Sequence, residues 1–162
     1  MSDPFAVLGL PRGVEVREDE LEARYLRLSR EWHPDYHSLG DRDDRLEALR
    51  RSAELNDAYR ALRDPWDRAR RLIELSAPGT MEQKKQLCPG FLVAAMELAE
   101  EVDAATSGQR QALAARMRRT LDDYLTAITE LLREQCWGDA ATKLHEARYY
   151  RRAVERLDEA RD

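Results

Sequence analysis

The residues best suited to chemistry stand close together in one stretch, His33-Pro34-Asp35, with a further histidine at His37. Imidazole and carboxylate groups bind metal ions, and two histidines four residues apart can share one face of a helix. Pro34 interrupts a helix at this point, because it lacks an N–H and disfavours the helical conformation of His33. We therefore expect an exposed corner between two helices and no metal site. A small metal-binding helical protein that uses His33, Asp35 and His37 is kept as a second alternative.

Patterns typical of enzyme active sites are absent from the rest of the sequence. It contains no Gly-rich phosphate-binding loop, no nucleophile elbow and no His-Glu-x-x-His pattern. His145 has no evident partner, and Cys88 and Cys136 lie 48 positions apart without a CxxC pattern, which favours two free thiols. We expect a protein that is not an enzyme and that holds no cofactor and no metal.

Three arginines precede the corner at every third position: Arg24, Arg27 and Arg30. On a helix this spacing keeps them within about a third of the circumference, away from the apolar positions Leu21 and Leu28. Such a basic face steers an acidic partner and raises its association rate. The alternative is that the arginines only balance the helix dipole and solvate one face.

The elements that must position these residues are predicted to be helices. Ala, Leu, Arg and Glu dominate the composition, whereas Val, Ile and Thr together make up under a tenth of the residues. In the first half we expect helices near 3–9, 18–32 and 41–63, the last two antiparallel, and a further helix that Asp64 caps and Pro65 opens. The third of these helices offers an apolar face made of Leu46, Leu49, Ala53, Ala58, Tyr59 and Leu62.

The second half predicts a different arrangement, because no proline follows Pro89-Gly90. Three long helices are expected here, near 91–107, 109–135 and 139–160. Short connections between them favour a three-helix bundle. The fold class is therefore all-α, with a domain over 1–75, a linker over 76–90 and the bundle over 91–162.

The first of these domains resembles the J-domain family, the co-chaperones that stimulate ATP hydrolysis by DnaK-type chaperones. The resemblance covers about residues 3 to 65 and is carried by the His-Pro-Asp triplet, the basic helix before it, and the helix that ends Leu55-Asn56-Asp57-Ala58-Tyr59 after it. It implies that His33, Pro34 and Asp35 engage the chaperone and promote hydrolysis there. Arg24, Arg27 and Arg30 are expected to support that contact.

With the second half included, the chain resembles the HscB family, the J-proteins of iron–sulfur cluster assembly. The bundle opens with an apolar and acidic stretch from Phe91 to Asp103 in which no basic residue occurs. The resemblance implies that one surface there binds an IscU-type scaffold protein, through Leu92, Val93, Met96, Glu97, Glu100 and, from the last helix, Tyr149. Leu98 and Val102 are expected to turn inward. Packing of the apolar members in the core is the alternative.

The expected function is therefore that of a co-chaperone that activates an HscA- or DnaK-type chaperone and delivers an IscU-type scaffold to it. A J-domain protein that serves a different client is the first alternative. With 27 basic and 32 acidic residues the net charge is −5, which is not typical of a nucleic-acid binder. No apolar run is long enough to span a membrane and no targeting segment is visible, so we expect a cytoplasmic location.

Overall fold

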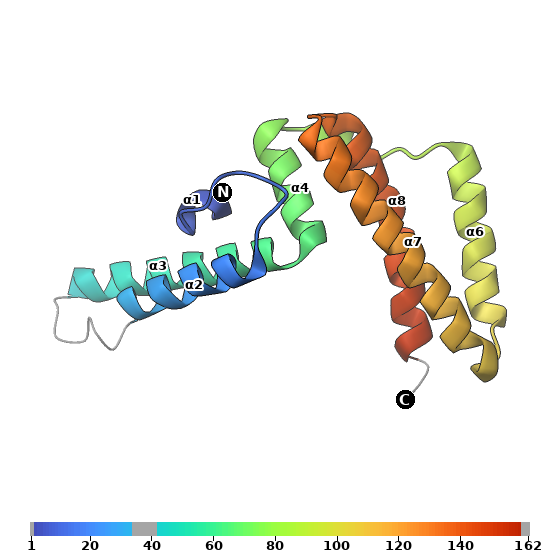
Figure 1. Cartoon of the computed structure of the whole chain (residues 1–162), viewed down its shortest axis with the longest axis horizontal. Coiled ribbons are helices and arrows are strands. Elements are labelled where there is room, and N and C mark those ends of the chain that lie inside the picture. The colour runs from blue at the N-terminus through green and yellow to red at the C-terminus, as the bar shows by residue number, and fades with distance from the viewer. Residues whose placement is uncertain (1, 34–41, 160–162) are drawn as a thin grey trace. The chain divides into compact units, whose positions relative to one another are not determined.

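The computed structural model describes residues 2–33 and 42–159, and within these ranges the chain forms α-helices and no strand (Figure 1). The all-α fold class is thus confirmed. The helices are α1 (Pro4–Val7), α2 (Glu18–Glu31), α3 (Arg42–Arg63), α4 (Pro65–Ser76), α5 (Thr80–Gln83), α6 (Pro89–Ala104), α7 (Ser107–Arg133) and α8 (Trp137–Glu159). None of these helices is long and apolar enough to cross a membrane. Contacts divide the chain into two compact units, Met1–Leu75 and Ser76–Asp162.

In the first unit, α2 and α3 run antiparallel and α1 packs against α3 (Figure 1). Tyr25 of α2 stacks on Tyr59 of α3, with ring centroids 4.2 Å apart, and its hydroxyl donates a hydrogen bond to Asn56 Oδ1 at 2.8 Å. The largest side chains that this unit buries completely are Phe5, Leu8, Leu21, Leu62 and Ile73. Burial of this apolar surface holds the helix pair together and fixes the direction in which α2 ends.

The buried face of α3 differs from the predicted one. Leu46 and Leu49 are about half exposed, at 50% and 53%, and Ala53 is exposed as well. The buried positions are Ala48 and Leu55, together with Ala58 and Leu62, which were predicted. Their spacings of seven, three and four follow one side of a helix, and Leu46 and Leu49 fall on the opposite side. The prediction was wrong for Leu46, Leu49 and Ala53, because an apolar residue type does not by itself say which side of the helix a residue occupies.

Two aspartates cap helices of this unit. Asp3 Oδ1 accepts the N–H of Phe5 at 2.9 Å, which caps α1. Asp64 Oδ1 accepts the N–H of Trp66 at 2.7 Å and that of Asp67 at 3.0 Å, which caps α4 as the sequence predicted. A cap of this kind satisfies N–H groups that the first turn leaves without a partner.

In the second unit, α5 lies inside the segment that was expected to be a linker, and α6 begins at Pro89, before its end. His145 is buried in α8, and its Nε2 lies 2.7 Å from the carbonyl oxygen of Met81 in α5. This contact supplies the partner that the sequence did not reveal, 64 residues away. The segment after Ser76 is therefore bound to the bundle.

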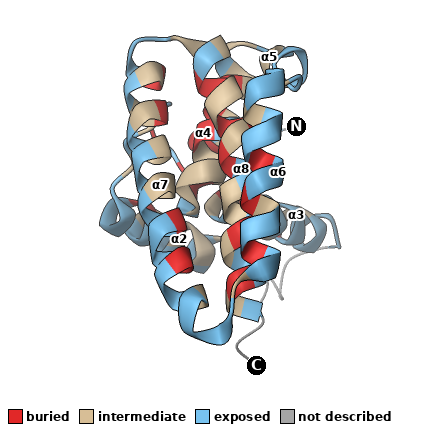
Figure 2. Cartoon of the chain, turned by 90° about the vertical axis from the view of Figure 1, so that its right-hand side faces the viewer, coloured by how far each residue is buried: buried red, intermediate tan, exposed pale blue. Residues whose placement is uncertain are grey.

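The core of the bundle lies where α6, α7 and α8 meet. It consists of Leu98, Val102, Leu113, Ala114, Met117, Ala153 and Leu157. One ion pair links each pair of helices near this core: Glu101 with Arg116, Asp103 with Arg156, and Asp158 with Arg118. Most of α6 is nevertheless exposed, and its buried positions are confined to part of its surface (Figure 2).

Candidate interaction surfaces

The predicted corner lies directly beyond the end of α2. The helix ends at Glu31, and the N–H of Trp32 donates the last helical hydrogen bond to the carbonyl of Leu28 at 3.0 Å. His33 follows and is exposed. Pro34 and Asp35, like His37 of the alternative metal site, lie outside the described residues. The structure thus places the first residue of the triplet on the surface of the first unit.

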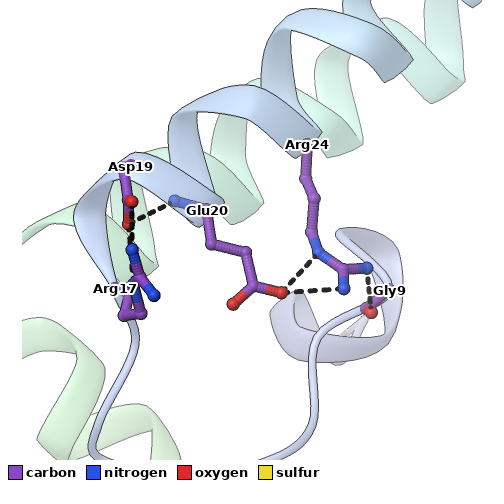
Figure 3. Close-up of polar contacts among 5 residues, drawn as sticks. All are labelled: Gly9, Arg17, Asp19, Glu20 and Arg24. Carbon is purple, nitrogen blue, oxygen red and sulfur yellow. Dashed lines mark hydrogen bonds and ion pairs between the residues drawn. The ribbon is translucent and has the colours of Figure 1, made fainter.

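Arg24 is engaged within the fold. Its guanidinium bonds Glu20 Oε1 through Nε at 3.0 Å and Nη2 at 2.8 Å, while Nη1 donates to the carbonyl of Gly9 at 2.5 Å (Figure 3). Gly9 has φ +64°, and a Cβ there would lie 3.2 Å from Arg24 Nη1. Arg24 therefore fastens α2 to the loop after α1, a use that spacing along the sequence could not predict.

Arg27 and Arg30 are different, because both are exposed and make no hydrogen bond or ion pair within the described part of the chain. They lie on α2 in the two turns before His33. We call Arg27, Arg30 and His33 the α2 ridge. Two unpaired guanidinium groups on one helix face present a positive potential to an approaching acidic surface.

A residue of α3 packs on Trp32, the residue just before the corner. The guanidinium of Arg51 lies over the ring of Trp32, 4.1 Å from its centroid, and Arg51 Nε donates to Glu47 Oε1 at 2.8 Å. This hydrogen bond lowers the pKa of the Glu47 carboxyl below its usual value. The Arg51 contact with the indole is a cation–π interaction, and it fixes Trp32 immediately before His33.

The second surface lies on α6, where large apolar side chains are exposed. Met96 is 66% exposed and Val93 55%, and Leu92 is exposed as well. Leu98 and Val102 of the same helix are buried, as predicted. Core packing of Leu92, Val93 and Met96 is therefore not what the structure shows.

Tyr149 of α8 also belongs to this surface, and a series of contacts between aromatic rings holds its side chain in place. Its ring meets that of Phe91 edge to face at 5.5 Å; Phe91 contacts Tyr150 at 6.4 Å, and Tyr150 contacts Tyr124 of α7 at 5.4 Å. Burial, and secondarily the Glu146 carboxylate to which its hydroxyl donates, raise the pKa of Tyr124 well above its usual value. Phe91 was not predicted as a site residue, although it stands at the start of the apolar run in the sequence. We call Leu92, Val93, Met96 and Tyr149 the apolar face.

The acidic residues of α6 divide into two pairs. Glu101 and Asp103 are engaged with Arg116 and Arg156, so they serve the bundle. Glu97 and Glu100 are exposed and make no hydrogen bond or ion pair with any described residue. Only the second pair is available to a partner, and these are the two acids that the sequence assigned to this surface.

The described residues include no group of three or more His, Cys, Asp or Glu side chains that could hold a metal ion. Cys88 is exposed and Cys136 half-buried, and neither is part of a disulfide. The α2 ridge offers charge to a binding partner, and the apolar face offers apolar area that a partner can bury.

Comparison with known proteins assigns both units. Residues 3–70 match the family model of the DnaJ domain, and residues 88–158 match that of the HSCB C-terminal oligomerisation domain. A co-chaperone protein HscB homolog from Haemophilus influenzae is 29% identical over 98% of this chain and 94% of its own length. The homolog from Vibrio vulnificus is 31% identical over 90% of this chain and 88% of its own length.

Solved structures agree with these matches. The chaperone HscB from Vibrio cholerae superposes with a TM-score of 0.87 at 26% identity, over 99% of this chain and 98% of that one. The human co-chaperone HscB has the same fold, with a TM-score of 0.88 at 21% identity over 99% of this chain and 83% of its own. With a DnaJ domain, an HscB C-terminal domain and relatives that match over nearly its whole length, the chain belongs to the HscB family of J-domain co-chaperones.

Proposed function

We propose that this chain stimulates the ATPase of an HscA- or DnaK-type chaperone and delivers an IscU-type scaffold protein to it during iron–sulfur cluster assembly or transfer. The observation that carries the proposal is that each unit exposes one distinct surface to solvent, basic on α2 and apolar on α6 and α8. These surfaces are the α2 ridge and the apolar face. They differ in chemistry, which suits two different partners.

On the chaperone side, Arg27 and Arg30 attract an acidic surface and set the orientation of approach. His33, Pro34 and Asp35 then engage the chaperone, and the interaction favours its hydrolysis-competent state by population shift. Arg24, which the sequence placed in the same set, contributes by holding α2 to the loop at Gly9. ATP is hydrolysed on the chaperone, so this chain acts without a catalytic residue or cofactor of its own.

On the scaffold side, Leu92, Val93, Met96 and Tyr149 lose water-exposed apolar area when the partner binds, and this burial supplies most of the affinity. Glu97 and Glu100 border the contact and favour a partner with basic residues there. A cytoplasmic location, and the absence of nucleic acid and membrane from the set of partners, belong to the same proposal.

The test compares wild-type protein with His33→Gln in an ATPase assay with the purified HscA- or DnaK-type chaperone. Wild type should stimulate hydrolysis, and the variant should lose that stimulation while it binds the scaffold protein with unchanged affinity. Undiminished stimulation by the variant would contradict the proposal. If stimulation is lost as expected but wild type fails to bind the scaffold, the chain serves a different client.

A further inference from the structure

A groove of about 150 Å³ lies between α6 and α8, beside the apolar face. The groove exists because small side chains line it from both helices, at Ala95, Ala99 and Ala153. Tyr149, Arg152 and Arg156 rise along the side that α8 forms. Tyr149 lines the groove and is also part of the apolar face, so the groove adjoins the surface proposed to bind the scaffold.

The size of the groove limits what can occupy it. Pockets for small molecules and cofactors usually hold about 300–1,000 Å³. The groove is smaller than this range, and the residues beneath it, Leu98 and Val102, are buried core residues. It fits one apolar side chain of a partner protein, which would displace water from an apolar floor.

Two arginines line the groove, and their charge determines which partner group can lie next to that side chain. Arg156 is already engaged by Asp103 of α6. Arg152 is exposed and makes no hydrogen bond or ion pair with any described residue. An unpaired guanidinium at the edge of an apolar groove favours a carboxylate, which it can bind in a bidentate manner.

We propose that this groove is a specificity subsite for the scaffold partner: it accepts one apolar side chain of that protein, and Arg152 binds an Asp or Glu carboxylate adjacent to it. The inference rests on the proposed function and deepens it. Glu97 and Glu100 of α6 are also unpaired within the described residues, so the partner meets free acids from one helix and a free base from the other. This arrangement disfavours the reversed orientation of the partner, because like charges would then meet.

The steric part of the proposal is tested by filling the groove. Ala99→Leu places a larger side chain among its lining residues and leaves the apolar face intact, whereas Ala94→Leu adds the same atoms at an exposed α6 position that does not line the groove. Calorimetric titration with the IscU-type scaffold should show about a tenfold loss of affinity for Ala99→Leu. Ala94→Leu should bind as wild type does, and both variants should keep the wild-type melting temperature within a few degrees.

The electrostatic part is tested by reversing one charge. Arg152→Glu should weaken scaffold binding about fivefold, and Arg119→Glu, which changes the net charge equally at an exposed α7 position away from the groove, should leave it unchanged. Replacing the partner carboxylate by Lys should then restore binding to Arg152→Glu, because the pair is formed again with its charges exchanged. The rescuing position is found by changing the acidic residues of the scaffold one at a time.

The outcomes separate this proposal from the broader one. If wild type binds the scaffold and Ala99→Leu binds equally well, the groove is not a subsite, and the proposed function stands. If Arg152→Glu and Arg119→Glu weaken binding equally, the effect is overall charge, and the assignment of Arg152 is wrong. If Ala99→Leu changes the oligomeric state in place of scaffold affinity, a second copy of this chain occupies the groove. If wild type does not bind the scaffold at all, both proposals fail.

Discussion

The α2 ridge and the apolar face are both exposed, yet the fold builds them in opposite ways. The arginines of α2 have two different roles. Arg24 is hydrogen-bonded to Glu20 and to the carbonyl of Gly9, whereas Arg27 and Arg30 have no partner among the described residues. The acids of α6 are likewise divided into paired and unpaired residues among those described, but the surface beside them is apolar. The ring of Phe91 supports Tyr149 at its edge.

This difference has a physical consequence for the two partners. Exposed charge acts over a distance of several ångströms, is screened by salt, and changes mainly the association rate. Apolar surface acts only on contact and changes mainly the dissociation rate. We therefore expect binding to the chaperone to depend on ionic strength, and binding to the scaffold to depend little on it.

The largest effect is expected where the apolar face is removed. Replacing Leu92, Met96 and Tyr149 together by Ala should lower scaffold affinity about a hundredfold, because three exposed apolar groups no longer lose water on binding. Titration calorimetry measures the loss. The circular dichroism spectrum and the ATPase stimulation without scaffold should match wild type, and a variant that unfolds would instead assign these residues to the core.

The next effect distinguishes the arginines of α2. Changing Arg27 and Arg30 to Glu should lower the association rate with the chaperone about tenfold at low salt, and the difference from wild type should shrink as salt is added. Stopped-flow measurements at two ionic strengths test this. The comparison would fail if Arg24→Ala slowed association equally without lowering stability, because Arg24 would then serve the partner and not the fold.

A third prediction concerns the support of the α2 ridge. Gly9→Ala should destabilise the first unit by about 1–2 kcal/mol, since the left-handed conformation at φ +64° disfavours a side chain and the added Cβ approaches Arg24. Urea unfolding monitored by tryptophan fluorescence measures the change. Gly13→Ala, where a Cβ meets nothing within 4 Å, provides the matched control, and equal stability of the two variants would contradict the role given to Gly9.

The smallest effect concerns the support of the apolar face. The pKa of Tyr124 is raised in the folded state, so the folded protein holds this proton more tightly than the unfolded chain does. Its contribution is present in full below the ordinary pKa of 10 and is lost as the pH rises above it. Tyr124→Phe should therefore reduce the loss of stability between about pH 10 and 11, as denaturant titrations at several pH values would show. An unchanged pH profile would contradict it.

The sequence predicted most of what depends on local pattern. The cap at Asp64, the helical stretches and the inward turn of Leu98 and Val102 follow from residue type and spacing, and the structure confirms them. It could not predict which partner a side chain finds across the fold. His145 meets Met81, and Arg24 meets Gly9, through contacts that only tertiary packing creates.

The candidate surfaces show the same limit. Composition identified an acid-only stretch on α6, but only the ion pairs to Arg116 and Arg156 separate its structural acids from its available ones. The groove at Arg152 was not predicted, because it needs alanines from two helices at once. Leu46 and Leu49 are the opposite case: their apolar type predicted a place on the buried face of α3, but the structure exposes both.

The central claim is that both surfaces must act on one chain, so that the chaperone meets the scaffold through it. The direct test is scaffold-dependent ATPase stimulation measured with a mixture of two variants, His33→Gln, which keeps the apolar face, and the triple Ala variant at Leu92, Met96 and Tyr149, which keeps the α2 ridge. We expect the scaffold to enhance stimulation by wild type, and we expect the mixture not to restore this enhancement. Full restoration by the mixture would contradict it, because the two surfaces would then work equally well on separate molecules.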